Sequence, residues 1–436
     1  MKILYGIYTL ITCSIFLTCL PSFLVYTHFG GRYGKNLKER LGYLPPRLVN
    51  ALSGEPRIWI HAVSMGEVHV AASIINALKE IMPACSIMLS TTTEHGRKLA
   101  KETIRSDIPV VYSPIDFIGS VRKALSRVHP HVLVFLETEI WPAWLTEARR
   151  MGIKTALING RISIRTIERY VKLRPFFREI LKNVDAFSMI SEEDGARIRD
   201  MGASPCRIQI NRNAKYDLLA KSADPDVEME LRRVLNLGRS QPVFVAGSTR
   251  GGEELHVLDA FEKILSKFPE MVLIIAPRHI ERTPEICALL EKRGFRYKLR
   301  SQLKCDTVQR TESVVIMNTI GELYKLYSIG TVVFCGASLV PLGGQNPLEA
   351  AVWGKVVFYG PSMEDFLDAK NLLETAGAGI PISDSGMLAE RAIHFLSHPE
   401  ELKKCGARGR EAVIKNRTAA IRHARVIKGL IYPNVA

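Results

Sequence analysis

The sequence predicts an α/β protein with two Rossmann-like domains that face each other across a cleft, preceded by an N-terminal membrane anchor helix. At 436 residues the chain is too long for one compact core, which favours two domains. Short apolar runs alternate with helix-like segments, as is typical of stacked βαβ units. The alternation starts afresh after a polar stretch between Asp217 and Gln241, so we expect a linker there. Ligands of open parallel sheets bind beyond the carboxyl ends of the strands, so the loops of both domains are expected to line the cleft.

The N-terminal segment is expected to be a membrane anchor. No charged residue occurs from Ile3 to Gly31, and the stretch from Ile3 to Tyr26 is long enough to cross a bilayer as a helix. A basic flank follows, opposed only by Glu39, and consists of Arg32, Lys35, Lys38, Arg40 and Arg47. This flank predicts that the chain after it stays on the cytoplasmic side. We therefore expect residues 1–31 to form a transmembrane signal-anchor, with an interfacial helix as the alternative.

The first domain is expected over residues 32–217. Its predicted strands, which are short apolar runs bounded by polar or turn residues, are Arg57–Ala62, Ser86–Ser90, Val110–Tyr112, His131–Leu136, Lys154–Ile158 and Ala186–Ile190. Helices are expected from about Val68 to Lys79 and from Glu94 onward. Because the runs are almost continuously apolar, they favour a parallel sheet that is covered on both faces.

The second domain is expected over residues 218–436, with helices at its end. Its predicted strands are Pro242–Ser248, Met271–Ala276, Ser313–Met317, Thr331–Gly336 and Val356–Tyr359. The two series are of similar size, and this is the observation that predicts a pair of similar domains.

Composition limits the classes of partner without choosing among them. The 59 Lys and Arg residues exceed the 44 Asp and Glu by 15, which suits nucleic acid, anionic lipid or an acidic small substrate. The eight cysteines are scattered without a C-x-x-C pair or a Cys/His ligand spacing, which favours reduced thiols in the cytosol. Asp224 and Asp226 resemble a metal-binding pair but follow no strand, so no metal site is expected. No Walker A and no G-x-G-x-x-G motif occurs, which argues against ATPase and dinucleotide-binding functions.

The run Gly343–Ala351 is the most informative stretch of the chain. It follows the predicted strand Thr331–Gly336, and Asn346, Pro347 and Glu349 suit the N-cap, first and third positions of a helix. A strand, a glycine loop and a helix N-terminus bind phosphate through free backbone N–H groups and the helix dipole. Glu349 adds an acceptor for a ribose hydroxyl. The alternative, an ordinary capping box without a ligand, is about as common as the functional arrangement.

Two carboxylates are candidates for proton transfer. Glu67 lies in the first turn of the helix after the first strand, behind Ser64, Met65 and Gly66, and suits a general base that takes a proton from a hydroxyl. Its alternative role is that of an acid that stabilises a helix N-terminus. Glu139 belongs to the run Glu137–Pro142 at the end of a buried strand, where it is a site residue or a capping acid.

Three further segments carry candidate anion-binding groups. Arg278 follows Pro277 at a strand end, where it pairs with a phosphate or carboxylate or is a solvated turn arginine. Gly321, Glu322 and Leu323 open a helix whose amides face an anion in the functional interpretation. A basic and aromatic segment suits a phosphorylated lipid or a membrane surface, or is a solvated helix face. Its residues are Arg161, Arg165, Arg169, Tyr170, Lys172, Arg174, Phe176, Phe177 and Arg178.

Together these stretches resemble the lipid A 3-deoxy-D-manno-octulosonic acid (Kdo) transferases, which are inverting glycosyltransferases of the GT-B fold. The resemblance runs from the anchor to near the C-terminus and rests on six ordered motifs. They are Arg32-Tyr33-Gly34, His61-Ala62-Val63-Ser64-Met65-Gly66-Glu67, Thr138-Glu139-Ile140-Trp141-Pro142, Ala276-Pro277-Arg278-His279, Gly321-Glu322-Leu323 and Asn346-Pro347-Leu348-Glu349.

The resemblance implies roles for these residues. Glu67 falls on the general base of the family and Glu139 on a supporting catalytic glutamate. Residues 32–217 would bind the acceptor and residues 218–436 the nucleotide sugar. The implied contacts with CMP are Pro277, Arg278, Gly321, Glu322, Leu323, Asn346, Pro347, Leu348 and Glu349.

The resemblance also implies substrates and a location. The donor would be CMP-Kdo and the acceptor a lipid A precursor (lipid IVA), with no cofactor, no metal and no nucleic acid partner. One or more Kdo residues would be transferred in lipopolysaccharide core biosynthesis. The chain would cross the cell inner membrane once, with its catalytic domains on the cytoplasmic side.

Two positions depart from the family pattern. Arg250 stands in Ser248–Glu254 where the family usually has a histidine, and Arg212–Lys215 replaces a Gly-Asn-Leu-Lys run. Two other functions remain open. One is a membrane-anchored GT-B transferase that uses another nucleotide sugar, and the other is a membrane-tethered binding protein without turnover.

Overall fold

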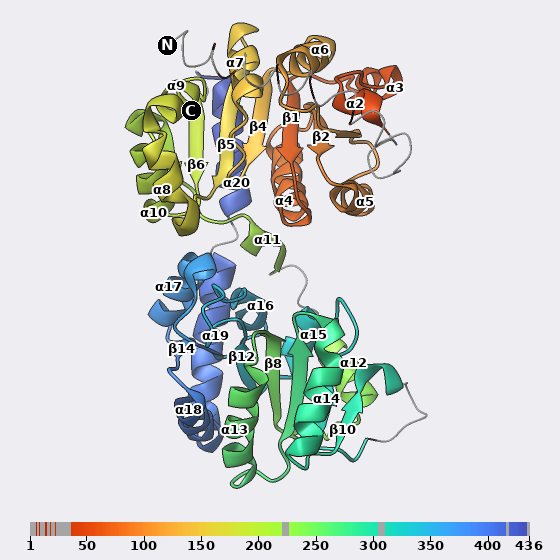
Figure 1. Cartoon of the computed structure of the whole chain (residues 1–436), viewed down its shortest axis with the longest axis vertical. Coiled ribbons are helices and arrows are strands. Elements are labelled where there is room, and N and C mark those ends of the chain that lie inside the picture. The colour runs from red at the N-terminus through yellow and green to blue at the C-terminus, as the bar shows by residue number, and fades with distance from the viewer. Residues whose placement is uncertain are drawn as a thin grey trace. The chain divides into compact units, whose positions relative to one another are not determined.

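The computed structural model describes residues 36–219, 226–303, 310–415 and 418–433, together with Gly6, Tyr8, Ser14, Thr18 and Ser22 (Figure 1). The signal-anchor expected at residues 1–31 falls largely outside the described residues. Within the described part of the chain, no helix is both long enough and apolar enough to span a membrane. The chain divides into two compact units, one of Met1–Leu218 with Thr418–Ala436 and the other of Leu219–Arg417.

The first unit is built on a seven-stranded parallel sheet with the order β3-β2-β1-β4-β5-β6-β7. The strands are β1 (Arg57–Ala62), β2 (Ser86–Thr91), β3 (Val110–Tyr112), β4 (Val132–Leu136), β5 (Lys154–Gly160), β6 (Ala186–Met189) and β7 (Ile208–Ile210). This order contains the Rossmann arrangement, in which the direction of winding reverses between β1 and β4. The loops after these two strands are therefore the expected place for a ligand.

Helices cover both faces of this sheet. They are α2 (Leu37–Arg40), α3 (Pro46–Asn50), α4 (Met65–Ile81), α5 (Glu94–Thr103), α6 (Ile118–Val128), α7 (Pro142–Arg150), α8 (Ile164–Lys172), α9 (Arg174–Leu181), α10 (Glu192–Asp200), α11 (Lys215–Leu219) and α20 (Ala419–Ile431). Successive side chains of β1 enter opposite cores, because strand residues alternate between faces. Ile58 and Ile60 pack in the core that contains α4 and α20, while Trp59 lies in the core that contains α6 and α7.

The C-terminal helix corrects the predicted domain boundary. The sequence predicts one domain over residues 218–436, whereas the structure places Thr418–Ala436 with the first unit. The blue helix α20 lies among the elements of that unit in Figure 1. His423 on α20 is buried, hydrogen-bonds the Ser188 hydroxyl (2.7 Å) and the Arg212 carbonyl (2.9 Å), and the Asp217 carboxylate accepts from the Ala420 N–H (2.8 Å). The sequence predicts helices at the end of the chain but does not tell which sheet they cover.

The second unit repeats the arrangement with a parallel sheet of order β10-β11-β9-β8-β12-β13-β14. The strands are β8 (Val243–Thr249), β9 (Val272–Pro277), β10 (Tyr297–Leu299), β11 (Val314–Ile316), β12 (Val332–Cys335), β13 (Val357–Tyr359) and β14 (Gly379–Pro381). The helices are α12 (Asp226–Val234), α13 (Glu254–Leu265), α14 (Thr283–Lys292), α15 (Leu323–Leu326), α16 (Leu348–Ala351), α17 (Leu367–Thr375), α18 (Ser385–Ser397) and α19 (Pro399–Lys415). Here the winding reverses between β8 and β12.

Every strand expected from the sequence corresponds to an observed strand, and β1 and β3 have the predicted bounds. The sequence does not predict β7, β10 and β14, which lie at sheet edges. Each of these has three residues and is only partly buried, so none appears as an apolar run. The stretch from Asp217 to Gln241 is also not only a linker, because α12 forms within it.

Candidate active site

Glu67 lies at the point where the winding of the first sheet reverses. The chain leaves β1 at Ala62, and Ser64 caps α4 by accepting a hydrogen bond from the Glu67 N–H (3.4 Å). The Glu67 carboxylate in turn accepts from the Ser64 hydroxyl (2.8 Å) and from the Val63 N–H (2.8 Å). These contacts hold the carboxylate in one position near the helix N-terminus. Glu67 therefore does stabilise the start of α4.

The electrostatics of Glu67 also suit a base. Burial raises its pKa to about 7, hydrogen bonds from Val63 and Ser64 oppose this rise, and the charges of Glu139 and Glu137 add to it. A carboxylate with a pKa near neutrality is a much better proton acceptor than an ordinary glutamate. The capping and functional interpretations of Glu67 are therefore compatible.

Glu139 follows β4, the neighbour of β1. Its carboxylate accepts from the indole N–H of Trp141 (2.6 Å), and burial raises its pKa, with a further contribution from Glu137. Trp141 packs edge-on against the ring of His61 on β1, with ring centroids 5.8 Å apart. Burial lowers the pKa of His61 to about 4, so this ring is neutral at pH 7. The structure thus brings the two predicted catalytic glutamates together at the ends of adjacent strands.

Lys215 is a residue of this site for which the sequence predicts no role. Its ammonium pairs with the Glu137 carboxylate at 2.5 Å and lies 3.8 Å from where a Cβ on Gly66 would be. Lys215 is the first residue of α11, and the residue before it is held by Asn159, whose side-chain oxygen accepts from the Ala214 N–H (2.8 Å). Lys215 belongs to the run that departs from the family pattern, and its role depends on contacts distant in sequence.

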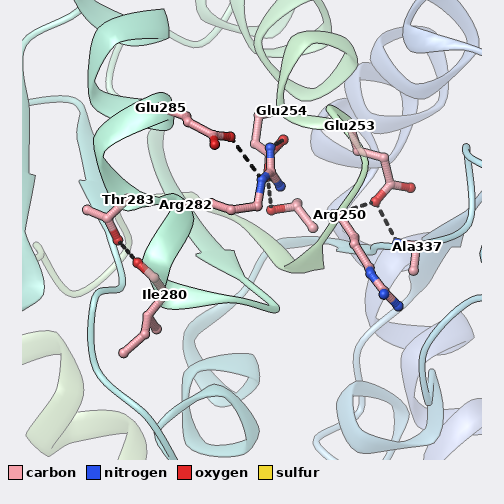
Figure 2. Close-up of polar contacts among 9 residues, drawn as sticks. Arg250, Glu253, Glu254, Ile280, Arg282, Thr283, Glu285 and Ala337 are labelled. Carbon is pink, nitrogen blue, oxygen red and sulfur yellow. Dashed lines mark hydrogen bonds and ion pairs between the residues drawn. The ribbon is translucent and has the colours of Figure 1, made fainter.

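In the second unit, the loop after β8 is bound to the loops after β9 and β12 by two buried glutamates (Figure 2). Glu254 forms a bidentate ion pair with Arg282 (2.8 and 3.0 Å) and accepts from the Thr249 hydroxyl (2.8 Å). Glu253 accepts hydrogen bonds from four backbone N–H groups of the described residues, including that of Ala337. No role for either glutamate is predicted from the sequence.

Arg278 and Glu349, both predicted to contact the nucleotide, lie near each other. Pro277 ends β9, and the backbone N–H of Arg278 donates to the Thr249 carbonyl (3.1 Å). The Arg278 side chain is exposed. Burial raises the pKa of Glu349 to about 7, and both a hydrogen bond with Asn346 and the positive charge of Arg278 oppose this rise. The positive charge of Arg278 therefore acts on the buried carboxylate of Glu349.

The start of α16 differs from the expected capping box. The side-chain oxygen of Asn346 accepts from the Leu348 N–H (3.2 Å), as expected of a cap, and Pro347 precedes the first helical residue. The hydrogen bond of the Glu349 carboxylate is with the Asn346 side chain. The side chain of Asn346 therefore contacts both the backbone at the start of α16 and the carboxylate of Glu349.

The prediction that the glycine loop offers free amides for phosphate is wrong for its two glycines. The Gly343 N–H donates to the Ser362 hydroxyl (2.9 Å), and the Gly344 N–H donates to the Ala337 carbonyl (2.8 Å). Gly344 has a φ of +76°, and a Cβ there would lie 2.4 Å from the sulfur of Met363. The glycines are needed for close packing of the loop and not for exposed donors.

The turn Gly321–Leu323 also lies near Glu349. Burial raises the pKa of the adjacent Tyr324 to about 12, and the charge of Glu349 contributes. The Glu322 carboxylate is engaged by Arg300 (2.9 Å) and the Thr319 hydroxyl (2.6 Å). The charge of Glu349 thus acts on Tyr324, which follows this turn, and interacts with the charge of Arg278.

Among the described residues, one group of side chains has the composition and spacing of a metal site: His394, His398 and Glu401. These side chains are exposed, and none of them is a predicted site residue.

Two Rossmann-like units with these sites define a class, that of two-domain α/β enzymes of the glycosyltransferase type. Solved structures with this fold include a glycosyltransferase from Rickettsia africae (TM-score 0.60, 15% identity, covering 87% of this chain and 99% of that one). The UDP-GlcNAc 2-epimerase from Neisseria meningitidis is similar (TM-score 0.62, 13% identity, 87% and 100%). At these identities the similarity concerns the fold alone.

Sequence comparison identifies the family. Residues 35–218 match the family model of 3-deoxy-D-manno-octulosonic-acid transferases (kdotransferases). The 3-deoxy-D-manno-octulosonic acid transferase of Haemophilus influenzae is 28% identical over 431 residues, 97% of this chain and 98% of that protein. A bifunctional glycosyltransferase/methyltransferase of Fusobacterium nucleatum is 34% identical over 325 residues, 74% of this chain, which spans only 50% of that protein. The chain belongs to the 3-deoxy-D-manno-octulosonic acid transferase family.

Proposed function

We propose that this chain transfers one or more Kdo residues from CMP-Kdo to a lipid A precursor in lipopolysaccharide core biosynthesis, with inversion at the anomeric carbon. The observation that carries the proposal is Glu67, a buried carboxylate with a pKa near 7 at the carboxyl end of β1, in a chain of this family. The relatives of Haemophilus influenzae and Bordetella pertussis carry the name of this transferase, which supports the same reaction here.

In this mechanism Glu67 accepts the proton of the acceptor hydroxyl while the hydroxyl oxygen forms a bond to the anomeric carbon of Kdo. The bond between that carbon and the phosphate oxygen of CMP breaks, and CMP leaves with the electron pair. Glu139 stays close enough to favour the protonated form of Glu67 after transfer, because like charges in a buried site repel. Lys215 pairs with Glu137 and limits the negative charge of this cluster.

The second unit would hold the nucleotide. Arg278 is the cation nearest in sequence to the end of β9, and we assign it to the phosphate of CMP. Glu349, oriented by Asn346, is assigned to a ribose hydroxyl, for which a carboxylate is a strong acceptor. Two turns are assigned to the rest of the nucleotide site, Gly321–Leu323 and Asn346–Leu348.

The relative affinities for CMP and UDP distinguish CMP-Kdo from a UDP-sugar as the donor. Isothermal titration of the full-length protein with CMP and with UDP is the direct test. Tighter binding of CMP is expected, whereas tighter binding of UDP would replace CMP-Kdo by a UDP-sugar as the donor.

The pH dependence of transfer should report Glu67. A base must be ionised to act, and because the pKa of Glu67 is raised to about 7, kcat/KM should rise with pH below neutrality and level off above it. Initial rates between about pH 5.5 and about pH 8.5 measure this, with CMP affinity followed over the same range as the control. A flat profile would show that Glu67 does not accept the proton in the rate-determining step.

The lipid acceptor is assigned to the surface of α8 and α9. Val171 and Leu173 are exposed there (42% and 58%), among Arg169, Lys172 and Arg174. Apolar side chains within a basic surface suit a phosphorylated lipid at a membrane. In this proposal the anchor at residues 1–31 holds the chain at the cytoplasmic face of the inner membrane, where the acceptor lies.

Replacing both exposed apolar residues by Glu tests this surface. The variant Val171→Glu/Leu173→Glu should raise KM for the lipid acceptor about tenfold with kcat unchanged, because apolar contact is lost and negative charge faces the phosphates. Met229→Glu, at an exposed position (67%) of α12, is the matched control. If KM for the lipid acceptor, measured in mixed micelles, were unchanged in this variant, the acceptor would not bind at this surface.

A further inference from the structure

The Glu253 carboxylate lies at the carboxyl ends of β8 and β12 and has no solvent exposure. It accepts four hydrogen bonds from backbone N–H groups: Arg250 (3.0 Å), Ala337 (2.5 Å), Ser338 (2.8 Å) and Leu339 (2.9 Å). Figure 2 shows it between the loop of Arg250 and Ala337, with the Arg250 side chain extending away from it. All four donors are main-chain groups, so their positions are set by the backbone of two loops.

Such a group of amides is ordinarily an anion-binding site. Consecutive N–H groups beside a residue in the left-handed region, here Ala337 with a φ of +56°, form a concave nest for phosphate. This nest also lies between β8 and β12, where the winding of the sheet reverses and where Rossmann-type folds bind the pyrophosphate of dinucleotides. In this chain the Glu253 carboxylate occupies the nest.

The glycines of the neighbouring loop, Gly343 and Gly344, do not offer free N–H groups that could bind a second phosphate instead. The N–H groups of Gly343 and Gly344 are bonded to Ser362 and to the Ala337 carbonyl. A second phosphate would also stand next to the buried charge of Glu253, and like charges in an interior repel strongly. The exposed side chain of Arg278, at the end of the neighbouring strand β9, is a cation that suits a single phosphate.

We propose that Glu253 determines donor specificity by filling the anion nest between β8 and β12, so that the site accepts a nucleotide with one phosphate and rejects a nucleoside diphosphate. The inference rests on the proposed function, since CMP-Kdo carries one phosphate between cytidine and sugar. It goes further because it names the residue that excludes diphosphates. Glu253 would touch neither the sugar nor the reacting atoms.

The test is the ratio of the dissociation constants of CDP and CMP, measured by isothermal titration on the full-length protein. The wild type should bind CDP more weakly than CMP by about tenfold or more, because a like charge opposes the second phosphate. In Glu253→Ser the nest is open and the charge removed, so the ratio should fall by about tenfold, with a smaller fall in Glu253→Gln. Glu270→Gln, an exposed glutamate next to β9, should leave the ratio unchanged.

The outcomes separate the two proposals. Failure of the wild type to bind CMP would overturn the proposed function and this inference with it. If the wild type binds CMP but binds CDP equally well, Glu253 does not exclude diphosphates, and this comparison stands even if the variants do not fold. Equal loss of affinity for CMP and CDP in folded variants would make Glu253 a purely structural link between loops and would also overturn the inference.

Discussion

Replacing Glu67 by Gln is expected to lower kcat by about 10²- to 10⁴-fold, the range that general-base catalysis supplies, while CMP affinity stays unchanged. The amide keeps the shape of the side chain, and its oxygen can still accept from Val63 or Ser64. It cannot accept a proton from the acceptor hydroxyl. Because Glu67 belongs to the first unit and the proposed CMP contacts to the second, binding of CMP should not depend on it.

The matched control is Glu80→Gln, an exposed glutamate near the other end of the same helix α4. Kinetics at saturating donor, with CMP titration and thermal unfolding of both variants, distinguish catalysis from folding. If Glu67→Gln retained wild-type kcat, Glu67 would be a capping residue only. If the loss of kcat were matched by a loss of folded protein, the role of Glu67 would likewise be structural and not catalytic.

Removing Arg282 is expected to destabilise the protein by about 3 kcal/mol, because it leaves the buried carboxylate of Glu254 without its charged partner. Glu254 is 1% exposed, and both of its oxygens are bound by the guanidinium. The variant Arg282→Leu, compared with the wild type by urea unfolding at neutral pH, measures this cost. Arg293→Leu, which removes an exposed pair with Asp259 and Glu262, is the control and should change stability little.

A second substitution separates charge from packing. Adding Glu254→Gln to Arg282→Leu removes the unpaired buried charge, so the double variant should recover part of the lost stability. If the single variant Arg282→Leu were as stable as the wild type, the pair would not hold the loops after β8 and β9 together. If the double variant were less stable than the single one, packing and not charge would dominate.

The strands could be predicted because parallel strands buried on both faces form continuous apolar runs, as β4 and β12 do. The short strands at the sheet edges could not, since a half-exposed strand such as β10 has no such run. The assignment of α20 to the first unit depends on contacts of His423 with Ser188 and Arg212, which lie more than 200 positions away. No local pattern contains that information.

Some residues of the candidate site could also be predicted from the sequence, and others could not. Glu67 and Glu139 could be proposed because each lies in the short segment after a predicted strand, and the ends of β1 and β4 are adjacent. Lys215 and Glu253 could not, because their roles come from contacts with Glu137 and with Ala337–Leu339 that only the folded chain brings together. The glycine loop shows the opposite error, since a familiar phosphate-binding pattern here has its glycine amides bonded internally.

The proposed activity of this chain is the addition of Kdo to a lipid. Mass spectrometry of a tetra-acylated lipid A precursor, after incubation with the full-length protein and CMP-Kdo, tests it most directly. We expect products heavier than the precursor by one or more Kdo residues, formed by the wild type and by Glu80→Gln but hardly by Glu67→Gln. An unchanged precursor, with folded protein and intact donor, would contradict the assignment of Kdo transfer to this chain.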